Sequence, residues 1–287
     1  MKTIYKSEKA KQEVLSLYDE KLESLNISYQ EIDVATSFGK TRVIKTGKKN
    51  GKKIILFHGI NAGAPVTLEA VKDLREDYLL FAIDTIGQAT KSAETTLNIK
   101  DDSYGIWADE VMEQLSIQEA YCIGISYGAY ILQKLLISKP DRILKSIFIV
   151  PSGLVNGKML PSLTKLSFPL MRYMLTKKDQ HLKAFTNAFV AKEDAFMFRM
   201  QKALLDGVNI DYRRPLLLKE KEVSHFTKPV YIMVADDDIF FPGEQAIQRA
   251  KQIFKNIGGI HYLKNCKHIP SLGTYSEIQN VIKGWLD

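Results

Sequence analysis

The chain has 287 residues, of which 45% are hydrophobic and 25% are charged, and its formal net charge is +7. This composition is typical of an ordinary globular protein, and no apolar run is long enough to cross a bilayer. Two cysteines are too few for a disulfide framework, and the N-terminus lacks the apolar core of a secretory signal. We therefore expect a cytoplasmic protein with no membrane partner.

The positive charge does not indicate a nucleic-acid partner. The 40 Lys and Arg residues outnumber the 33 Asp and Glu residues, but most of them are scattered lysines. The densest run lies in residues 45–53, and within it residues 47–53 combine lysines with Gly47, Asn50 and Gly51. This composition predicts a solvated hairpin turn rather than a binding stripe, so we expect no nucleic acid among the partners.

The predicted elements begin with an amphipathic helix over residues 6–26, where apolar residues recur at helical spacing. Two short strands follow, near residues 28–34 and 41–46, and strands and helices then alternate. Further strands are predicted over residues 53–57, 78–83, 120–125, 143–150, 230–234 and 259–263, and further helices over residues 103–115, 127–139, 243–254 and 275–286. Apolar strands in such an alternation are typical of a parallel sheet covered on both faces.

The alternation is interrupted in residues 152–225, which are rich in Leu, Phe and Met at loosely helical intervals. We therefore predict an N-terminal helical leader in residues 1–27, an α/β core in residues 28–151 and 226–287, and a helical cap in residues 152–225. Methionine and phenylalanine suit the inner face of such a cap, so some of those in the insertion are expected to line a pocket. They are Met159, Met171, Met174, Met197, Met200, Phe168, Phe185, Phe189, Phe196 and Phe198.

The pentapeptide Gly124-Ile125-Ser126-Tyr127-Gly128 lies between a predicted strand and a predicted helix. In a tight turn of this kind the central residue adopts an uncommon backbone conformation that exposes its side chain. Glycines two positions to either side allow the strand and the helix to approach each other. The pattern alone arises by chance in roughly one such chain in twenty. Its position between strand and helix makes Ser126 a candidate nucleophile.

A serine nucleophile needs a histidine to accept its proton, and the histidine needs a carboxylate to fix its tautomer. His268 follows the last predicted strand, and loops at the carboxyl ends of parallel strands open onto the same crevice. Three acids, Asp236, Asp237 and Asp238, follow the preceding strand. Asp238 is preferred because the apolar residues 239–241 come next and shield it from water, and Asp237 and Asp236 stay as alternatives.

Two backbone N–H groups are expected to stabilise the oxyanion that forms during acyl transfer. One is that of Tyr127, directly after the serine. The other comes from the loop after the strand at residues 53–57, with Ile60 as the first choice and Asn61 as the second. His58 and Gly59 begin this loop, and His58 is expected to brace it by hydrogen bonding rather than to act as a base.

Five landmarks occur in a fixed order: His58-Gly59, Asp84-Thr85-Ile86-Gly87, the turn around Ser126, Asp238 four residues before Pro242, and His268. In this order the chain resembles the α/β-hydrolases, from about residue 30 to its end. Residues 36–41 and 81–92 also resemble bacterial carboxylesterases of the NP type. The resemblance implies a mostly parallel, doubly wound sheet with a helical cap. The family often has glycine where this chain has Ala235 and Lys267, and a lysine beside the histidine would place a charge near the site.

The predicted function is a serine hydrolase that cleaves carboxylic esters of small, fairly apolar molecules through an acyl-enzyme, without a cofactor. One alternative keeps the same residues but acts on an amide, a thioester or a carbon–carbon bond. Another is a sensor that binds a small molecule without turnover. Cys266, His268 and His261 are close in sequence, but their spacing matches no zinc pattern, so no metal site is expected. Homodimerisation through the cap or the N-terminal helix is an open alternative.

Overall fold

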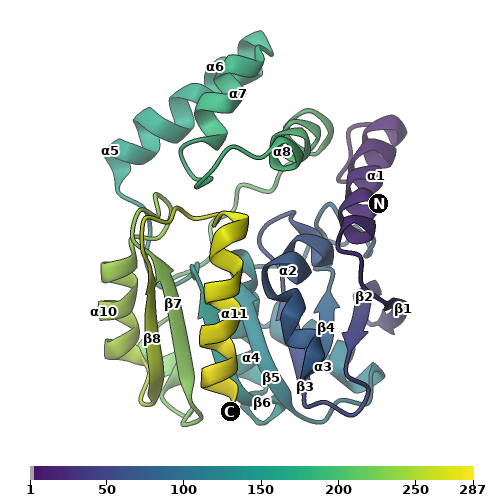
Figure 1. Ribbon diagram of the computed structural model, residues 1–287, viewed down its shortest axis with the longest axis vertical. Helices are drawn as coiled ribbons and strands as arrows, with labels where there is room; N and C mark the ends of the chain where they lie inside the picture. The colour runs from purple at the N-terminus through teal and green to yellow at the C-terminus, as the bar shows by residue number, and fades with distance from the viewer. Residues whose placement is uncertain (1–2) are drawn as a thin grey trace.

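The computed structural model describes residues 3–287, which contain one eight-stranded sheet (Figure 1). The strand order is β1-β2-β4-β3-β5-β6-β7-β8. β2 runs antiparallel to both β1 and β4, and all the other neighbours pair in parallel, so the mostly parallel sheet is confirmed. The strands are β1 Tyr29–Thr36, β2 Gly39–Gly47, β3 Lys53–Phe57, β4 Leu79–Ile83, β5 Ala120–Ile125, β6 Ile143–Ile149, β7 Val230–Ala235 and β8 Ile257–Leu263.

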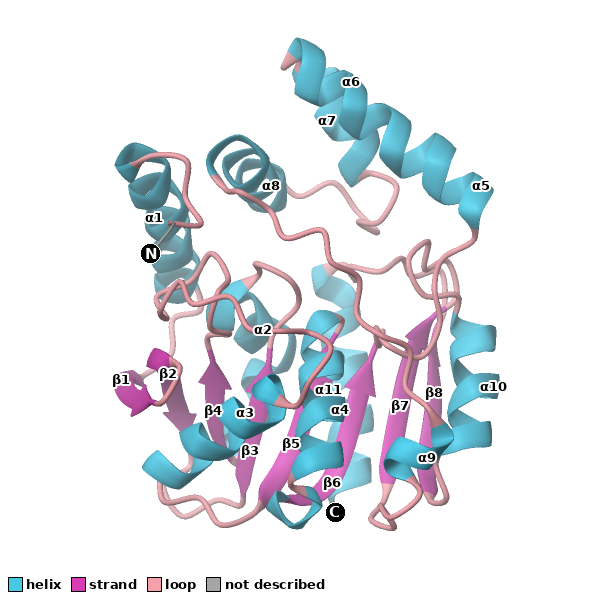
Figure 2. Cartoon of the chain, turned by 180° about the vertical axis from the view of Figure 1, so that it is seen from behind, coloured by secondary structure: helices cyan, strands magenta, loops and turns pink. Residues whose placement is uncertain are grey.

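Helices cover both faces of this sheet (Figure 2). The core of one face includes α3 Ser103–Gln114, α4 Tyr127–Ser138 and α10 Gly243–Ile253, and the core of the other includes α2 Gly63–Val71 and α11 Leu272–Leu286. Along β3, residues 55 and 57 belong to the first core and residues 54 and 56 to the second. Because successive strand side chains point to opposite faces, a strand between two helical layers is apolar throughout.

The lysine-rich turn is not a hairpin, which corrects the prediction from the sequence. β2 and β3 lie on opposite sides of β4, so residues 48–52 cross the end of β4 instead of joining two neighbouring strands. The N–H of Lys48 donates to the carbonyl oxygens of Arg75 and Tyr78, both at 3.0 Å. The composition of the turn does not reveal this crossing, because its lysines are solvated in either topology.

Helix α2 and the 3-10 turn η1 Lys72–Glu76 are not among the elements expected from the sequence. The residue at the N-cap position of α2, Ala62, has no side chain that could bond to the first turn of the helix. The Asp84 carboxylate, at the end of β4, accepts a hydrogen bond from the N–H of Ala64 at 2.9 Å and one from the N–H of Lys91 at 3.1 Å. The capping group thus comes from a distant part of the chain, and a local pattern cannot show it.

Burial of Asp84 predicts a pH-dependent stability. Desolvation raises the pKa of this fully buried carboxyl from 3.8 to about 6, although its backbone hydrogen bonds oppose the shift. Between about pH 4 and pH 6 the folded chain holds a proton that the unfolded chain has released, so stability falls as the pH rises through this window. The loss amounts to about 3 kcal/mol at 1.36 kcal/mol per pKa unit.

This prediction is checked by urea unfolding of the wild type and of Asp84→Asn at several pH values. The substitution removes the titrating group, so the free energy of unfolding of the wild type relative to the variant is expected to decrease between pH 4 and pH 6. A constant difference across that range would contradict the assignment. Because the comparison uses only the pH dependence, the hydrogen bond that the amide loses does not affect it.

Residues 152–225 are called the insertion below. Its elements are α5 Met159–Pro161, the π-helical turn η3 Ser162–Ser167, α6 Phe168–Thr176, α7 Asp179–Thr186, α8 Ala195–Gly207 and α9 Glu220–Val223. Helices α5 to α8 lie above the carboxyl ends of the parallel strands (Figure 1), whereas α9 packs beside α10 on one face of the sheet (Figure 2). Beside the insertion stands α1 Glu8–Ser24, whose first turn is capped by the Ser7 hydroxyl, which accepts from the N–H of Ala10. Val14 and Leu17 of α1 pack with Met200 and Leu204 of α8, so the N-terminal helix supports the insertion.

Candidate active site

Ser126 lies in the turn between β5 and α4 with φ 53° and ψ −115°. A non-glycine residue in this region of backbone space is strained, and the surrounding structure must hold it there. The N–H of Ser126 donates to the carbonyl of Ile149 at 2.9 Å. Its carbonyl accepts from the N–H of Ala129 at 3.0 Å. Bonds in both directions therefore fix the turn that presents the hydroxyl.

The two glycines of the pentapeptide are required by close backbone contacts. A Cβ on Gly124 would lie 2.5 Å from the carbonyl oxygen of Gly128. A Cβ on Gly128 would lie 2.0 Å from the carbonyl oxygen of Phe57, at the end of the neighbouring strand β3. No side chain fits at these distances, so the approach of strand and helix depends on glycine at both positions.

Ser152 also holds the turn, and the sequence did not single it out. Its hydroxyl donates to the carbonyl of Ser126 at 3.0 Å, and its own carbonyl accepts from Nε2 of Gln133 at 2.8 Å. Ser152 and Gln133 are both almost fully buried. The available signal was position, because Ser152 follows β6, which is the neighbour of β5 at the same edge of the sheet.

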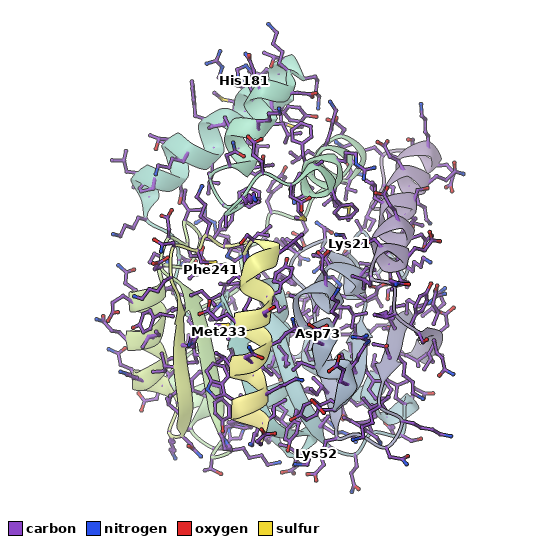
Figure 3. The ribbon with its side chains drawn as sticks, viewed as in Figure 1. Lys21, Lys52, Asp73, His181, Met233 and Phe241 are labelled. Carbon is purple, nitrogen blue, oxygen red and sulfur yellow. The ribbon has the colours of Figure 1, made fainter. Side chains whose placement is uncertain are left out.

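The structure brings Ser126, His268 and Asp238 together. Nε2 of His268 lies 2.8 Å from Oγ of Ser126, and Nδ1 lies 2.7 Å from Oδ2 of Asp238. A carboxylate only accepts, so Nδ1 carries the proton and Nε2 is left to accept from the serine hydroxyl. The rings of Phe240 and Phe241 stand edge-on to the imidazole at 5.0 and 5.4 Å. Figure 3 places Phe241 where the sheet meets the helices above it.

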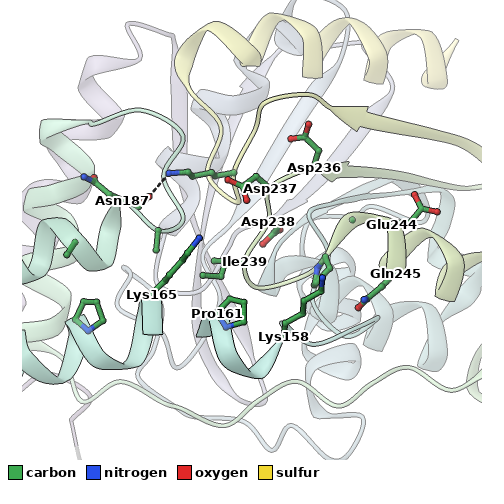
Figure 4. Close-up of a pocket in the computed structure, with 16 residues that line it drawn as sticks. Lys158, Pro161, Lys165, Asn187, Asp236, Asp237, Asp238, Ile239, Glu244 and Gln245 are labelled. Carbon is green, nitrogen blue, oxygen red and sulfur yellow. Dashed lines mark hydrogen bonds between the residues drawn. The ribbon is translucent and has the colours of Figure 1, made fainter. Parts of the chain in front are cut away.

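The three acids after β7 have different surroundings (Figure 4). The Asp238 side chain is fully buried, and its Oδ1 accepts from the N–H groups of Phe240 and Phe241 at 2.8 and 3.1 Å. Asp236 is exposed and accepts from the N–H groups at positions 265 and 266, which lowers its pKa and fastens the histidine loop. Asp237 is exposed. Only Asp238 contacts the imidazole among the three.

The loop of His268 is also fixed from the insertion. The N–H of Ile269, the next residue, donates to the carbonyl of Phe189 at 2.9 Å, and the carbonyl of Ile269 accepts from Ala191 at 2.9 Å. Lys267 points away from the serine, because its Nζ donates to the carbonyl of Asn187 at 2.6 Å (Figure 4). The charge expected beside the histidine is therefore directed to the insertion, and it ties the two loops together.

His58 connects two loops at the edge of the sheet. It is fully buried, its Nε2 accepts from the N–H of Thr85 at 2.8 Å, and its Nδ1 lies 2.6 Å from the carbonyl of Gly59. Nδ1 therefore carries the proton. Burial lowers the pKa of this imidazole to about 4, so the ring stays neutral near neutral pH. Gly59 faces the serine, since a Cβ there would lie 3.6 Å from Cβ of Ser126.

The expected oxyanion donors differ in their partners. The N–H of Asn61 donates to Oε1 of Gln88 at 2.6 Å, and Oδ1 of Asn61 accepts from the N–H of Ala89 at 3.0 Å. Within residues 3–287 the N–H groups of Ile60 and Tyr127 have no acceptor. Asn61 thus braces the loop, and Ile60 and Tyr127 hold the free donors. Gln88 was not anticipated, although it follows β4 at the same edge of the sheet.

Comparison with known proteins supports the fold. The family described as alpha/beta hydrolase fold matches residues 52–189. The solved structure of naproxen esterase (carboxylesterase NP) from Bacillus subtilis superposes with a TM-score of 0.82 at 18% identity and covers 96% of this chain and 98% of its own. The chain has the α/β-hydrolase fold.

Two Bacillus subtilis (strain 168) proteins also resemble this chain in sequence. Carboxylesterase YbfK is 22% identical over 267 residues, covering 89% of this chain and 87% of YbfK. The uncharacterized carboxylesterase nap is 21% identical over 267 residues, covering 89% of this chain and 86% of its own. Both resemblances expected from the residues, to α/β-hydrolases and to NP-type carboxylesterases, are thereby confirmed.

A cavity of about 360 Å³ opens above Ser126, and its walls are mostly apolar. Its size lies in the range of small-molecule sites. Among the Met and Phe residues of the insertion, Phe185, Phe189, Met197 and Met200 line it. Aliphatic side chains of α2 and α8 complete the walls, including Val66, Leu204 and Leu205. The cavity therefore has the serine and histidine at its floor and the insertion as its roof.

The three residues considered as a metal site, His261, Cys266 and His268, each have different surroundings. Nε2 of His261 bonds to Oε1 of Glu277 on α11 at 2.7 Å, and His268 is engaged with the serine. The Cys266 thiol is buried, which raises its pKa to about 12. Across the described residues, no three His, Cys, Asp or Glu side chains are grouped to hold a metal ion.

Proposed function

We propose that this α/β-hydrolase is a serine carboxylesterase whose catalytic residues are Ser126, His268 and Asp238. The observation that carries the proposal is the unbroken hydrogen-bonded chain from Oγ of Ser126 through the imidazole to a buried carboxylate, at the floor of an apolar cavity. In such a chain the histidine acts as a general base toward the hydroxyl, and the carboxylate stabilises the imidazolium that results.

In the acylation step, Oγ of Ser126 attacks the ester carbonyl carbon while Nε2 of His268 takes the hydroxyl proton. The carbonyl oxygen becomes an oxyanion, for which the free N–H groups of Ile60 and Tyr127 are the proposed donors. Collapse of the tetrahedral intermediate breaks the bond to the alcohol oxygen, which leaves with the proton from His268. The acyl group stays on Ser126.

In the deacylation step, a water molecule gives a proton to Nε2 of His268 and its oxygen attacks the acyl carbon. The carboxylic acid leaves, and the proton returns to Oγ of Ser126. Ionised Asp238 balances the charge of the imidazolium in both steps. No cofactor takes part in this sequence.

The cavity supports small, fairly apolar esters as the substrate class. Apolar walls favour aliphatic or aromatic groups and provide few partners for a charged substrate. The insertion acts as a cap in this proposal, because Phe185, Phe189, Met197 and Met200 face the space above Ser126. Adaptable thioether and aromatic groups suit ligands of varied shape.

Labelling with a fluorophosphonate probe tests the proposed nucleophile without knowledge of the substrate. Oγ of Ser126 is expected to form a bond to phosphorus and to displace fluoride, with the proton passing to His268. Mass spectrometry of the digested protein should find the label on the peptide that contains Ser126. Urea-denatured protein serves as the control, since only the folded site activates the hydroxyl.

A substrate panel separates the ester proposal from its alternatives. Aryl esters of short fatty acids are expected to be hydrolysed faster than the matched anilides, thioesters and diketones. Labelled protein that hydrolyses an anilide or a thioester faster would keep Ser126 as nucleophile and overturn the ester class. Folded protein that neither labels nor turns over would favour the sensor.

A further inference from the structure

The insertion has an apolar face that no other part of the described chain covers. Leu160, Leu163, Phe168, Met171 and Leu175, called the outer stripe below, are each more than half exposed, and Leu175 is 78% exposed. Figures 1 and 2 show the helices that carry the stripe, α5 to α6, at the end of the molecule farthest from the lower edge of the sheet. Large exposed apolar patches are rare on monomeric proteins, and where they occur they often mark a site of interaction with another molecule.

The spacing of the outer stripe shows that it is one continuous face. Its steps are three, five, three and four residues, and the step of five spans the π-helical turn η3. A π turn holds more residues than an α turn, so the longer step keeps Leu163 and Phe168 on the same side. The opposite side of this helix is buried, with Leu166 and Tyr173 packed against other residues of the insertion.

The charges on α6 and α7 beside the outer stripe are almost all positive, whereas Lys158 and Lys165 line a pocket that also contains Asp236, Asp237 and Glu244 (Figure 4). Residues 158–186 contain one acid, Asp179, which is paired with Lys202 of α8. Of the cations in the same residues, Lys177 is paired with Asp206, whereas Arg172, Lys178 and Lys183 have no ion pair among residues 3–287. The guanidinium of Arg172 lies over the Phe168 ring at 5.6 Å, so charge and apolar surface are adjacent. The six cations are Lys158, Lys165, Arg172, Lys177, Lys178 and Lys183.

From this combination we infer that the outer stripe docks on an anionic lipid surface. An amphipathic helix with aromatic and aliphatic residues on one side and Lys or Arg beside them lies in the plane of a bilayer interface. Anionic headgroups attract the flanking cations. A second copy of this chain fits less well, because a two-fold contact through the stripe would bring two sets of these cations together. None of the helices in residues 3–287 is long and apolar enough to span a bilayer, so the contact is a surface one.

Docking in this way would place the cavity close to the lipid. Leu170 lies on α6, which carries part of the stripe, and Phe185 lies on α7, which packs against α6; both line the cavity from the inner side. Apolar esters partition into bilayers, so a docked protein would meet them at high local concentration. The docking inference itself concerns only the stripe and does not depend on the proposed chemistry.

Vesicle flotation with the full chain tests the inference. The wild type is expected to float with vesicles of phosphatidylcholine that contain about one-third phosphatidylglycerol and to stay in solution with phosphatidylcholine alone, since each Lys or Arg near an anionic surface contributes about 1 kcal/mol. The double variant Leu163→Ser, Leu175→Ser is expected to bind at least about tenfold more weakly because it loses apolar area at the interface. Arg172→Glu with Lys178→Glu is expected to weaken binding similarly.

Ile106→Ser is the matched control, because Ile106 is also an exposed apolar residue but lies on α3, away from the stripe. It is expected to bind vesicles like the wild type. Hydrolysis of a soluble aryl ester without vesicles should be equal in the stripe variants and the wild type, which separates failure of docking from failure of the proposed esterase. Absence of flotation at low salt, equal flotation with both lipids, or a dimer in solution that the stripe variants abolish would each overturn the inference.

Discussion

Ser126→Ala is expected to lower kcat for a short-chain aryl ester by roughly a million-fold, the size of effect found when the serine of a hydrolase triad is removed. The reason is that no other group within hydrogen-bond distance of His268 can receive the acyl group. Steady-state hydrolysis measures the loss, and a melting curve shows that the variant is folded. Activity of Ser126→Ala close to that of the wild type would refute the nucleophile assignment.

The same assay identifies the carboxylate among the three candidates. Asp238→Asn is expected to lower kcat by roughly ten-thousand-fold, because the amide cannot stabilise the imidazolium and favours the wrong tautomer. Asp237→Asn is the matched control and is expected to stay within about twofold of the wild type, since surface substitutions of this kind act weakly. A large loss with Asp237→Asn and little loss with Asp238→Asn would reverse the assignment.

Gly128→Ala is expected to produce the largest loss of stability. The added Cβ would meet the carbonyl oxygen of Phe57 at 2.0 Å. The backbone of residue 128 fixes the position of the Cβ, and the oxygen belongs to the backbone of β3, so β3 and α4 must move apart. Overpacking of a core costs up to about 3 kcal/mol, and a backbone clash as short as this one belongs at or above that limit. The melting temperature is expected to fall by roughly 5 °C or more for a chain of this size.

Gly284→Ala is the control for this prediction. Gly284 lies in α11, and a Cβ there would have nothing within 4 Å. Alanine is a better helix former than glycine by up to about 1 kcal/mol, so this variant is expected to melt slightly above the wild type. Equal melting temperatures for Gly128→Ala and the wild type would show that the close approach of β3 and α4 does not require glycine at position 128.

The sequence predicts best those features that local patterns or sheet topology determine. Apolar runs identify the parallel strands, and the rule that their carboxyl ends share one edge places Ser126, Asp238 and His268 near one another. The same rule cannot show which of the three consecutive acids, Asp236, Asp237 or Asp238, bonds to the histidine. Asp238 is preferred because the apolar residues 239–241 follow it in the sequence. In the structure the N–H groups of Phe240 and Phe241 donate to its carboxylate.

Features that depend on contacts distant in sequence escaped prediction. Helix α2 is capped by Asp84 rather than by a neighbour, and the turn of the nucleophile is held by Ser152 from the loop after the adjacent strand β6. The prediction of a hairpin at the lysine-rich turn is wrong because amino-acid composition indicates that a segment is solvated but not which strands it connects. Predicting these three features requires the order of the strands in the sheet, and local sequence patterns do not contain that order.

The contact between α1 and α8 has a consequence for how the chain folds. Val14 and Leu17 are synthesised well before their partners Met200 and Leu204, which lie more than 180 residues later in the sequence. Contacts of such long sequence separation form late, because the entropy of closing the intervening loop must be overcome first. The apolar side of α1 that faces α8 is therefore exposed until α8 has been synthesised, so α1 is buried later than helices that pack on near neighbours in the sequence.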